Sequence, residues 1–220
     1  MAYQLDHEGR MERERLRNIE SLYDQITVER LDKLGVDEGW QCLELGAGGG
    51  SIVEWLCQRV GKWGRVVAAD LQTTFLETID ASNLEIRQHD VRTDPLETSA
   101  YDLIHARKLM EHLPERDELI GKLVAALKPG GRLLIESGDY ASFVSVEGDP
   151  NGLFERAWSR FFDVLVAAGF DLYYGRRLGS ALRAGGLKDV QSKAVWWNGV
   201  VHAGGRVLGC TCFNASGTRS

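Results

Sequence analysis

Hydrophobic residues occur along this chain in short runs that alternate with stretches of helical periodicity. The runs of strand length lie at 41–45, 65–69, 84–88, 102–106 and 131–136. Strands that alternate with helices in this way are typical of a parallel sheet covered by crossover helices on both faces. The pattern therefore predicts an α/β fold with a doubly wound, mostly parallel sheet.

Two of the intervening segments have a clear helical stripe. In 51–60 the apolar residues recur at helical spacing and two glycines punctuate the exit. Farther along, Leu119, Leu123 and Leu127 form a stripe that ends at a Pro-Gly pair. Both segments are predicted to be helices that pack on the sheet.

Residues 1–34 are predicted to form an N-terminal helical cap. One apolar face of this charged segment consists of Leu16, Ile19, Leu22, Tyr23 and Ile26. Such an amphipathic helix packs on the sheet or over its pocket. Thr27 has the side chain of an N-cap, which predicts a second helix from there to Leu34.

The segment 139–170 is too long for a simple connection and is predicted to be an insertion that contains a helix over 152–168. Phe154, Trp158 and Phe161 lie on one side of that helix. One interpretation is core packing or a dimer surface. The other is an aromatic lid over a substrate pocket, because the insertion follows the carboxyl end of the fifth strand, where open sheets bind ligands.

The C-terminal region predicts two more strands, at 189–197 and 206–213. Residues 213–220 have little apolar periodicity and are predicted to be a disordered tail. The connection between the two strands is short, and the sheet edge is expected to be incomplete, swapped with a partner or rebuilt. An open edge would favour a homodimer.

Length and composition are those of one domain spanning 1–220. The chain has 44 % apolar residues, which suffice for a core without disulfide or metal support. The net charge is −6 and the sequence has no long basic run, so it does not predict a positively charged surface that would bind nucleic acid or an anionic membrane. A small-molecule substrate is therefore favoured. The sequence has no long apolar stretch and no signal peptide, so a cytoplasmic location is expected.

The four cysteines are predicted to be unligated thiols. Cys210 and Cys212 form a C-x-C without the second pair that a zinc site would need. No metal is therefore expected.

The segment CLELGAGGGS at 42–51 has the chemistry of a cofactor loop. Gly46 and Gly48 allow the backbone to turn sharply and approach a ligand, and the helix that follows offers free N–H groups. Acids follow the next two strands, at Asp70 and Asp90. Together these features predict a pocket for a nucleotide-type cofactor.

These motifs, in this order, resemble the class I S-adenosylmethionine-dependent methyltransferases that act on small molecules. The matching pieces are LELGAGGGS (43–51), VVAADL (66–71), IRQHDV (86–91), YDLIHARKLMEHLP (101–114) and LKPGGRLLIES (127–137). The resemblance implies a Rossmann-like fold, S-adenosyl-L-methionine as cofactor and S-adenosyl-L-homocysteine as product. The opening YQLDHEGRMERERL, which includes Tyr3, resembles the leader that closes over the cofactor in some of these enzymes.

The resemblance also assigns roles to individual residues in the pocket. The methionine portion of the cofactor would be lined by Glu44, Gly46, Ala47 and Gly48. Asp70 would accept hydrogen bonds from both ribose hydroxyls, which suits a carboxylate with two oxygens. The adenine would be held by Leu71, Asp90 and Val91.

The end of the fourth strand would place Ala106 and Arg107 at the mouth of the pocket. There Arg107 could pair with the cofactor carboxylate through its guanidinium. His105 and His112 are candidate general bases, although each also has a structural interpretation, His105 within a buried strand and His112 in a helical turn. The methylated atom, whether oxygen, nitrogen or carbon, stays open.

Two alternatives remain at this point. One is a cofactor-binding relative without activity, which would share the same pocket. The other is an NAD-dependent dehydrogenase, since a glycine loop followed about 20 residues later by an acid suits that cofactor as well. Against the second, the third glycine of G-x-G-x-x-G is absent and Glu44 would repel a pyrophosphate.

Overall fold

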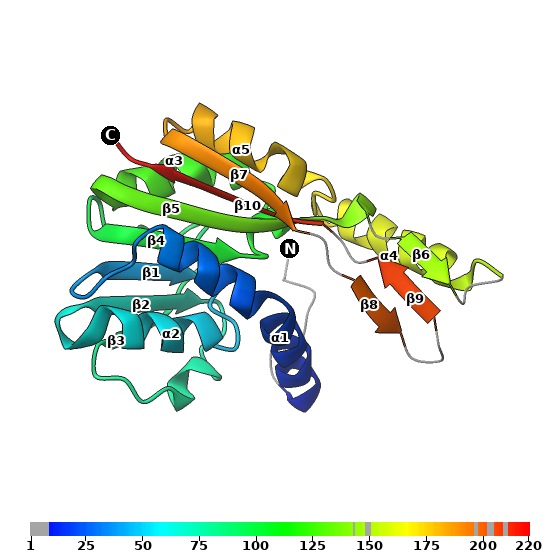
Figure 1. The fold of residues 1–220 in the computed structure, drawn as a ribbon, viewed down its shortest axis with the longest axis horizontal. Helices are drawn as coiled ribbons and strands as arrows, with labels where there is room; N and C mark the ends of the chain where they lie inside the picture. The colour runs from blue at the N-terminus through cyan, green and yellow to red at the C-terminus, as the bar shows by residue number, and fades with distance from the viewer. Residues whose placement is uncertain (1–8, 143, 148–150, 196–197, 202–204, 209–210) are drawn as a thin grey trace.

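A mostly parallel seven-stranded sheet forms the centre of the computed structural model (Figure 1). The structure describes residues 9–142, 144–147, 151–195, 198–201, 205–208 and 211–220. The strand order is β3-β2-β1-β4-β5-β10-β7, and β10 runs antiparallel to both of its neighbours. The predicted α/β fold with a doubly wound sheet is confirmed.

The strands lie where the apolar runs are. Their bounds are β1 (Gln41–Leu45), β2 (Arg65–Asp70), β3 (Leu84–Gln88), β4 (Tyr101–Arg107), β5 (Leu127–Asp139), β7 (Lys188–Val195) and β10 (Thr211–Thr218). The predicted fifth strand is too short at both ends, since β5 starts at Leu127 opposite Tyr101 and pairs with β10 as far as Asp139.

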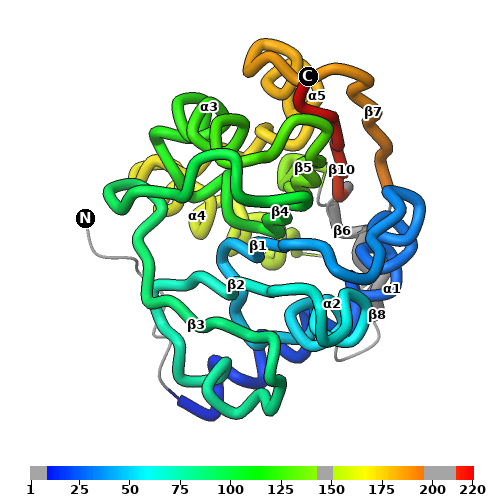
Figure 2. The backbone as a smooth tube through the Cα atoms, turned by 90° about the vertical axis from the view of Figure 1, so that its left-hand side faces the viewer, coloured from blue at the N-terminus to red at the C-terminus, as the bar shows by residue number. Residues whose placement is uncertain are grey.

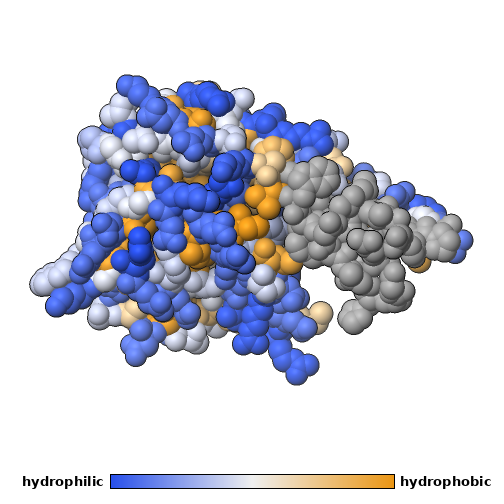
Figure 3. All heavy atoms as spheres, viewed as in Figure 1, coloured by the Kyte–Doolittle hydropathy of each residue, from blue (hydrophilic) through white to orange (hydrophobic). Residues whose placement is uncertain are grey.

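Helices cover both faces of this sheet, and each face has its own apolar core (Figures 1 and 2). The helices α1 (Arg10–Lys33) and α2 (Ser51–Val60) pack on one face. The helices α3 (Arg116–Ala126) and α5 (Tyr174–Ala184) pack on the other. Figure 3 shows the face that carries α1 and α2 as mainly hydrophilic, with apolar residues exposed along its middle.

The N-terminal segment differs from the prediction because α1 continues through Thr27 without a break. Thr27 is fully buried, and its hydroxyl lies 3.1 Å from the carbonyl of Tyr23 and 2.5 Å from Oε2 of Glu136. A threonine can stay within a helix when it hydrogen-bonds the preceding turn. The contact with β5 favours this position over that of a cap.

The C-terminal region also differs. β10 starts later than the predicted last strand and inserts between β5 and β7, so the prediction of a disordered tail from 213 was wrong as far as Thr218. Backbone hydrogen bonds to two neighbours order this tail although its apolar periodicity is weak. The argument for a homodimer from an incomplete edge therefore does not hold.

A second, smaller sheet with the order β6-β9-β8 lies beyond the carboxyl end of β5. Its strands are β6 (Val144–Glu147), β8 (Asn198–Val201) and β9 (Gly205–Leu208). The helix α4 (Leu153–Ala167) lies beside it, close to the bounds predicted for the insertion helix. In the described part of the chain no helix is long and apolar enough to cross a membrane.

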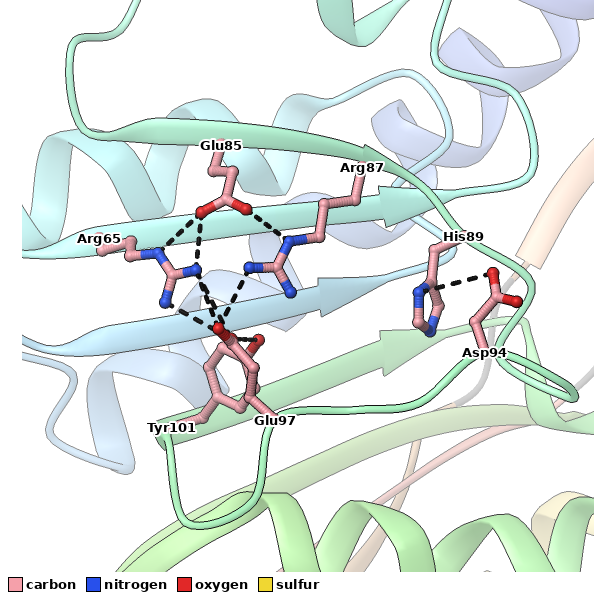
Figure 4. A network of polar contacts seen from close by, with 7 residues as sticks. All are labelled: Arg65, Glu85, Arg87, His89, Asp94, Glu97 and Tyr101. Atoms are coloured by element: carbon pink, nitrogen blue, oxygen red, sulfur yellow. Dashed lines mark hydrogen bonds and ion pairs between the residues drawn. The ribbon is translucent and has the colours of Figure 1, made fainter.

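A polar network ties β2 and β3 to the loop that precedes β4 (Figure 4). Glu85 accepts hydrogen bonds from Arg65 and Arg87, each at 2.6 Å. The hydroxyl of Tyr101 donates to Glu97 at 2.5 Å, and both arginines lie 3.4 Å from the same carboxylate. Arg65 and Tyr101 are the first residues of β2 and β4, away from the cofactor loop, so the network joins these strands and β3 at that end of the sheet.

Candidate functional site

The carboxyl ends of β1 to β4 bring the predicted cofactor residues to one edge of the sheet. The chain leaves β1 toward β2 on one side and returns to β4 on the other, so a switch point lies between β1 and β4. Open α/β sheets bind ligands at such points. Asp70 and Arg107 are the last residues of β2 and β4, and the cofactor loop and Asp90 follow β1 and β3.

The cofactor loop has the backbone that its glycines allow. Gly46 and Gly48 have φ angles of 67° and 55°, in the left-handed region that other residues rarely adopt. The carboxylate of Asp70 accepts hydrogen bonds from the N–H groups of Gly48, at 2.9 Å, and Gln72, at 3.0 Å. Asp70 is therefore fixed beside the loop, at the place where the sequence predicts the ribose contact.

The helix α1 covers this loop. A side chain at Gly48 would meet Leu16 of α1 at 3.2 Å, and the Arg13–Glu20 ion pair of the same helix lies against Gly49. The helix α1 therefore shields the loop in part, and residues 46–49 are half-buried. Tyr3 lies outside the described residues.

Asp90 follows β3 and is held by Arg92, two residues later. Arg92 donates to its carboxylate at 2.5 and 2.8 Å, and these hydrogen bonds lower the pKa of Asp90. Val91 is buried and Leu71 half-buried. The contacts of these three residues with adenine stay a prediction.

A row of buried polar side chains crosses the sheet beneath α1. His105 of β4 is fully buried, with Nδ1 2.7 Å from Oε2 of Glu44 and Nε2 3.4 Å from Oε2 of Glu136. Asn214 of β10 donates to the other oxygen of Glu136 at 2.6 Å. Four adjacent strands, β1, β4, β5 and β10, thus contribute one polar side chain each.

The charges in this row support one another. Burial by itself would lower the pKa of His105, but Glu44 and Glu136 outweigh it and raise the pKa to about 9. Burial would raise the pKa of Glu136, but the contact with His105 lowers it. A buried imidazolium with both nitrogens engaged is a poor proton acceptor, so this geometry contradicts the prediction of His105 as a general base.

Arg107 connects the end of β4 to α1. Its guanidinium lies 2.8 Å from Oδ1 of Asp24 and donates to the hydroxyl of Thr27 at 3.0 Å. Ser51, the first residue of α2, lies 3.1 Å from the same oxygen of Asp24. Arg107 was predicted to bind the cofactor carboxylate, whereas in this structure α1 holds it. The sequence analysis did not predict that Asp24 would hold Arg107. The only local indication is that this acid comes directly after Tyr23, on the apolar face of the helix.

A second buried carboxylate organises the segment after β5. Glu111 is fully buried and accepts hydrogen bonds from Ser137 Oγ at 2.7 Å, from the N–H of Gly138 at 3.3 Å and from the hydroxyl of Tyr140 at 3.2 Å. The adjacent His112 packs edge-on against Phe170, with ring centroids 4.7 Å apart. Its catalytic role stays a prediction.

The aromatic side chains of the insertion helix form a stack. The ring centroids of Phe154 and Trp158 are 5.7 Å apart, and those of Trp158 and Phe161 are 5.4 Å apart. Phe161 is 46 % exposed, so these residues are not in the protein core. Their role as a substrate lid stays a prediction.

Residues 43–135 match the family described as "Methyltransferase domain". This match covers less than half of the chain, and it supports the resemblance to the class I S-adenosylmethionine-dependent methyltransferases. This match favours the methyltransferase interpretation over the dehydrogenase alternative. Among the described residues, no group of three or more His, Cys, Asp or Glu side chains could hold a metal ion.

The chain spans about half the length of the curated relatives it matches. It is 28 % identical over 115 residues to the ubiquinone/menaquinone biosynthesis C-methyltransferase UbiE of Francisella tularensis subsp. tularensis, covering 49 % of this chain and 46 % of that protein. With the UbiE of Saccharophagus degradans the identity is 30 % over 125 residues, covering 53 % and 49 %.

Solved structures with low sequence identity share the fold. An S-adenosylmethionine-dependent methyltransferase from Aquifex aeolicus has a TM-score of 0.64 at 19 % identity, covering 99 % of this chain and 100 % of that one. Phosphoethanolamine N-methyltransferase 2 of Haemonchus contortus, in complex with S-adenosyl-L-methionine, has a TM-score of 0.62 at 15 % identity, covering 90 % and 52 %. These likenesses concern the fold alone.

Proposed function

We propose that this protein transfers a methyl group from S-adenosyl-L-methionine to a small-molecule acceptor and releases S-adenosyl-L-homocysteine. The observation that carries this proposal is the cofactor loop, whose left-handed glycines lie beside a carboxylate that the loop itself holds in place. The family match and the cofactor named for the Haemonchus protein support the choice of ligand.

The residues at the sheet edge fit such a cofactor. Gly46, Ala47 and Gly48 allow close approach of its methionine portion, and the negative charge of Glu44 suits an ammonium group. Each oxygen of Asp70 accepts one backbone hydrogen bond and can accept a second one from a ribose hydroxyl. Leu71, Asp90 and Val91 would surround the adenine.

The protein contributes mainly position and exclusion of water. When bound, S-adenosyl-L-methionine supplies a methyl group on a sulfonium, which an acceptor takes by in-line displacement without a metal. Arg107 holds α1 over the loop through Asp24, and the buried Ala106 would lie at the mouth of the pocket beside the methyl donor. His112 and the aromatic side chains of α4 are proposed to lie on the acceptor side. The relatives named as C-methyltransferases make carbon one acceptor atom to test.

A calorimetric titration with S-adenosyl-L-methionine, S-adenosyl-L-homocysteine and NAD tests this function. We expect micromolar binding of the two adenosyl ligands only. Asp70→Ala should weaken it by about 10- to 100-fold, the equivalent of a lost charge-assisted hydrogen-bond pair. Asp80→Ala, an exposed acid in the following loop, is the matched control.

Binding of NAD in preference to the adenosyl ligands would overturn the proposal. Equal affinity in Asp70→Ala would overturn the ribose contact. Tight cofactor binding together with a failure to methylate any acceptor would instead favour a relative without activity.

A further inference from the structure

Lys108 has an unusual backbone at the mouth of the candidate site. It follows Arg107 directly and has a φ of 56°, in the left-handed region, while its N–H donates to the carbonyl of Glu136 at 2.8 Å. That conformation is unfavourable for a residue other than glycine. Such residues persist where the surroundings hold them, and they cluster at ligand sites.

The side chain of Lys108 lies between two tyrosines from distant parts of the chain. Its ammonium is 4.8 Å from the ring centroid of Tyr23, on α1, and 5.1 Å from that of Tyr140, which follows β5. Gly138 makes room for this arrangement. A side chain there would lie 2.5 Å from the Tyr140 ring and 3.0 Å from the ammonium.

Tyr140 is fixed in turn by its own contacts. Its hydroxyl lies 3.2 Å from Glu111, and its ring packs edge-on against Phe170 and Phe162, at centroid distances of 5.0 and 6.0 Å. The ammonium of Lys108 therefore lies beside a wall of aromatic rings.

We propose that Lys108, Tyr23 and Tyr140 bind the methyl acceptor, and that this acceptor is an aromatic compound with an anionic oxygen, a carboxylate or a phenolate. This inference rests on the proposed function, because the cluster lies at the carboxyl ends of β4 and β5, where the methyl donor would be. The aromatic wall suits a planar ring. An ammonium partly shielded from water by two rings attracts an anionic oxygen more strongly than one in bulk water.

The same arrangement explains how transfer proceeds without His105 as a base. Lys108 would lower the pKa of a bound phenol, so that the phenol loses its proton to solvent before the methyl group moves. The phenolate oxygen then forms the new C–O bond while the C–S bond breaks and its electron pair stays on sulfur. A carboxylate on the ring would instead anchor the acceptor through the same ammonium.

Binding of simple probes tests this site. We would titrate benzoate, 4-nitrophenolate, benzyl alcohol and benzylammonium into the protein with and without S-adenosyl-L-homocysteine. The anionic probes should bind and the neutral and cationic ones should not, and comparison of the two anions separates carboxylate from phenolate. Lys108→Met should weaken the anions at least about tenfold, whereas Lys108→Arg keeps most of the affinity.

Two further variants serve as controls. Lys62→Met removes an ammonium that lies 4.9 Å from the Trp63 ring, away from this cluster, and should change nothing. Gly138→Ala keeps the charge but displaces Lys108 and Tyr140, so it should weaken the anions even if Lys108→Met fails to fold.

Several outcomes would overturn the site. These are no binding of either anion, a preference for benzylammonium, or equal anion affinity in wild type, Lys108→Met and Gly138→Ala. If the anions bind and need Lys108 while S-adenosyl-L-homocysteine does not bind at all, the anion site stands and the proposed function fails.

Discussion

The Nδ1 atom of His105 lies 2.7 Å from Oε2 of Glu44, and this contact joins the ends of β4 and β1 beneath α1. Both side chains are out of reach of solvent, and Glu136 completes the group on the other side of the ring. Buried charges add little net stability as a set, but removal of one partner is costly because it leaves an uncompensated charge. The floor of the candidate site thus depends on a histidine that does not contact a substrate.

Replacement of His105 by leucine should destabilise the protein by about 3–5 kcal/mol, because two carboxylates would then be buried without a cation. Urea unfolding of the variant and the wild type measures this difference. The triple variant His105→Leu, Glu44→Gln and Glu136→Gln removes the charges together and should recover much of the loss. A loss below about 1 kcal/mol in the single variant would contradict the charged arrangement.

Stability should fall in mildly alkaline solution because of the same histidine. The pKa of His105 is raised in the folded protein from 6.5 to about 9, so its contribution is complete below pH 6.5 and is lost as the pH rises toward 9. We expect the wild type to lose more stability than His105→Gln between pH 6.5 and 9. Parallel stability curves for the two proteins would show that His105 is not charged when folded.

Arg107→Met should loosen α1. The substitution removes the ion pair with Asp24 and the hydrogen bond to Thr27. Hydrogen exchange of the α1 amides should become faster, while exchange in β1 and β2 stays unchanged. Arg17→Met, at an exposed position on the same helix, is the control. Unchanged exchange in α1 would mean that its apolar contacts alone hold it.

The contribution of the network in Figure 4 to stability should be lost in acid. The hydrogen bond from Tyr101, together with Arg87 and Arg65, lowers the pKa of Glu97 to about 2. Its contribution is therefore present above pH 4.5 and is lost as the pH falls toward 2. Because Glu97 is 41 % exposed, we expect Glu97→Gln to cost about 1 kcal/mol at most at pH 7, measured by thermal unfolding. The wild type and the variant should converge near pH 2.

The sequence by itself determined the sheet up to β5, the helix α2 and the cofactor loop. Buried parallel strands appear as apolar runs, and a left-handed turn needs glycine, so both leave local signals. Asp70 was found in the same way, because an acid at the end of β2 can only lie at the edge of the sheet where the loop is.

Only the tertiary structure decided what depends on partners far away in the chain. The helix α1 continues through Thr27 because this residue contacts Glu136, 109 residues later. The tail is ordered because β10 pairs with β5 on one side and with β7 on the other. His105 is a structural cation since two other strands bring carboxylates to it. The proposed role of Lys108 likewise depends on two tyrosines from other segments, whose rings its ammonium contacts. The local sequence propensity for helix or strand does not predict such contacts, because they contribute free energy only when the segments pack together.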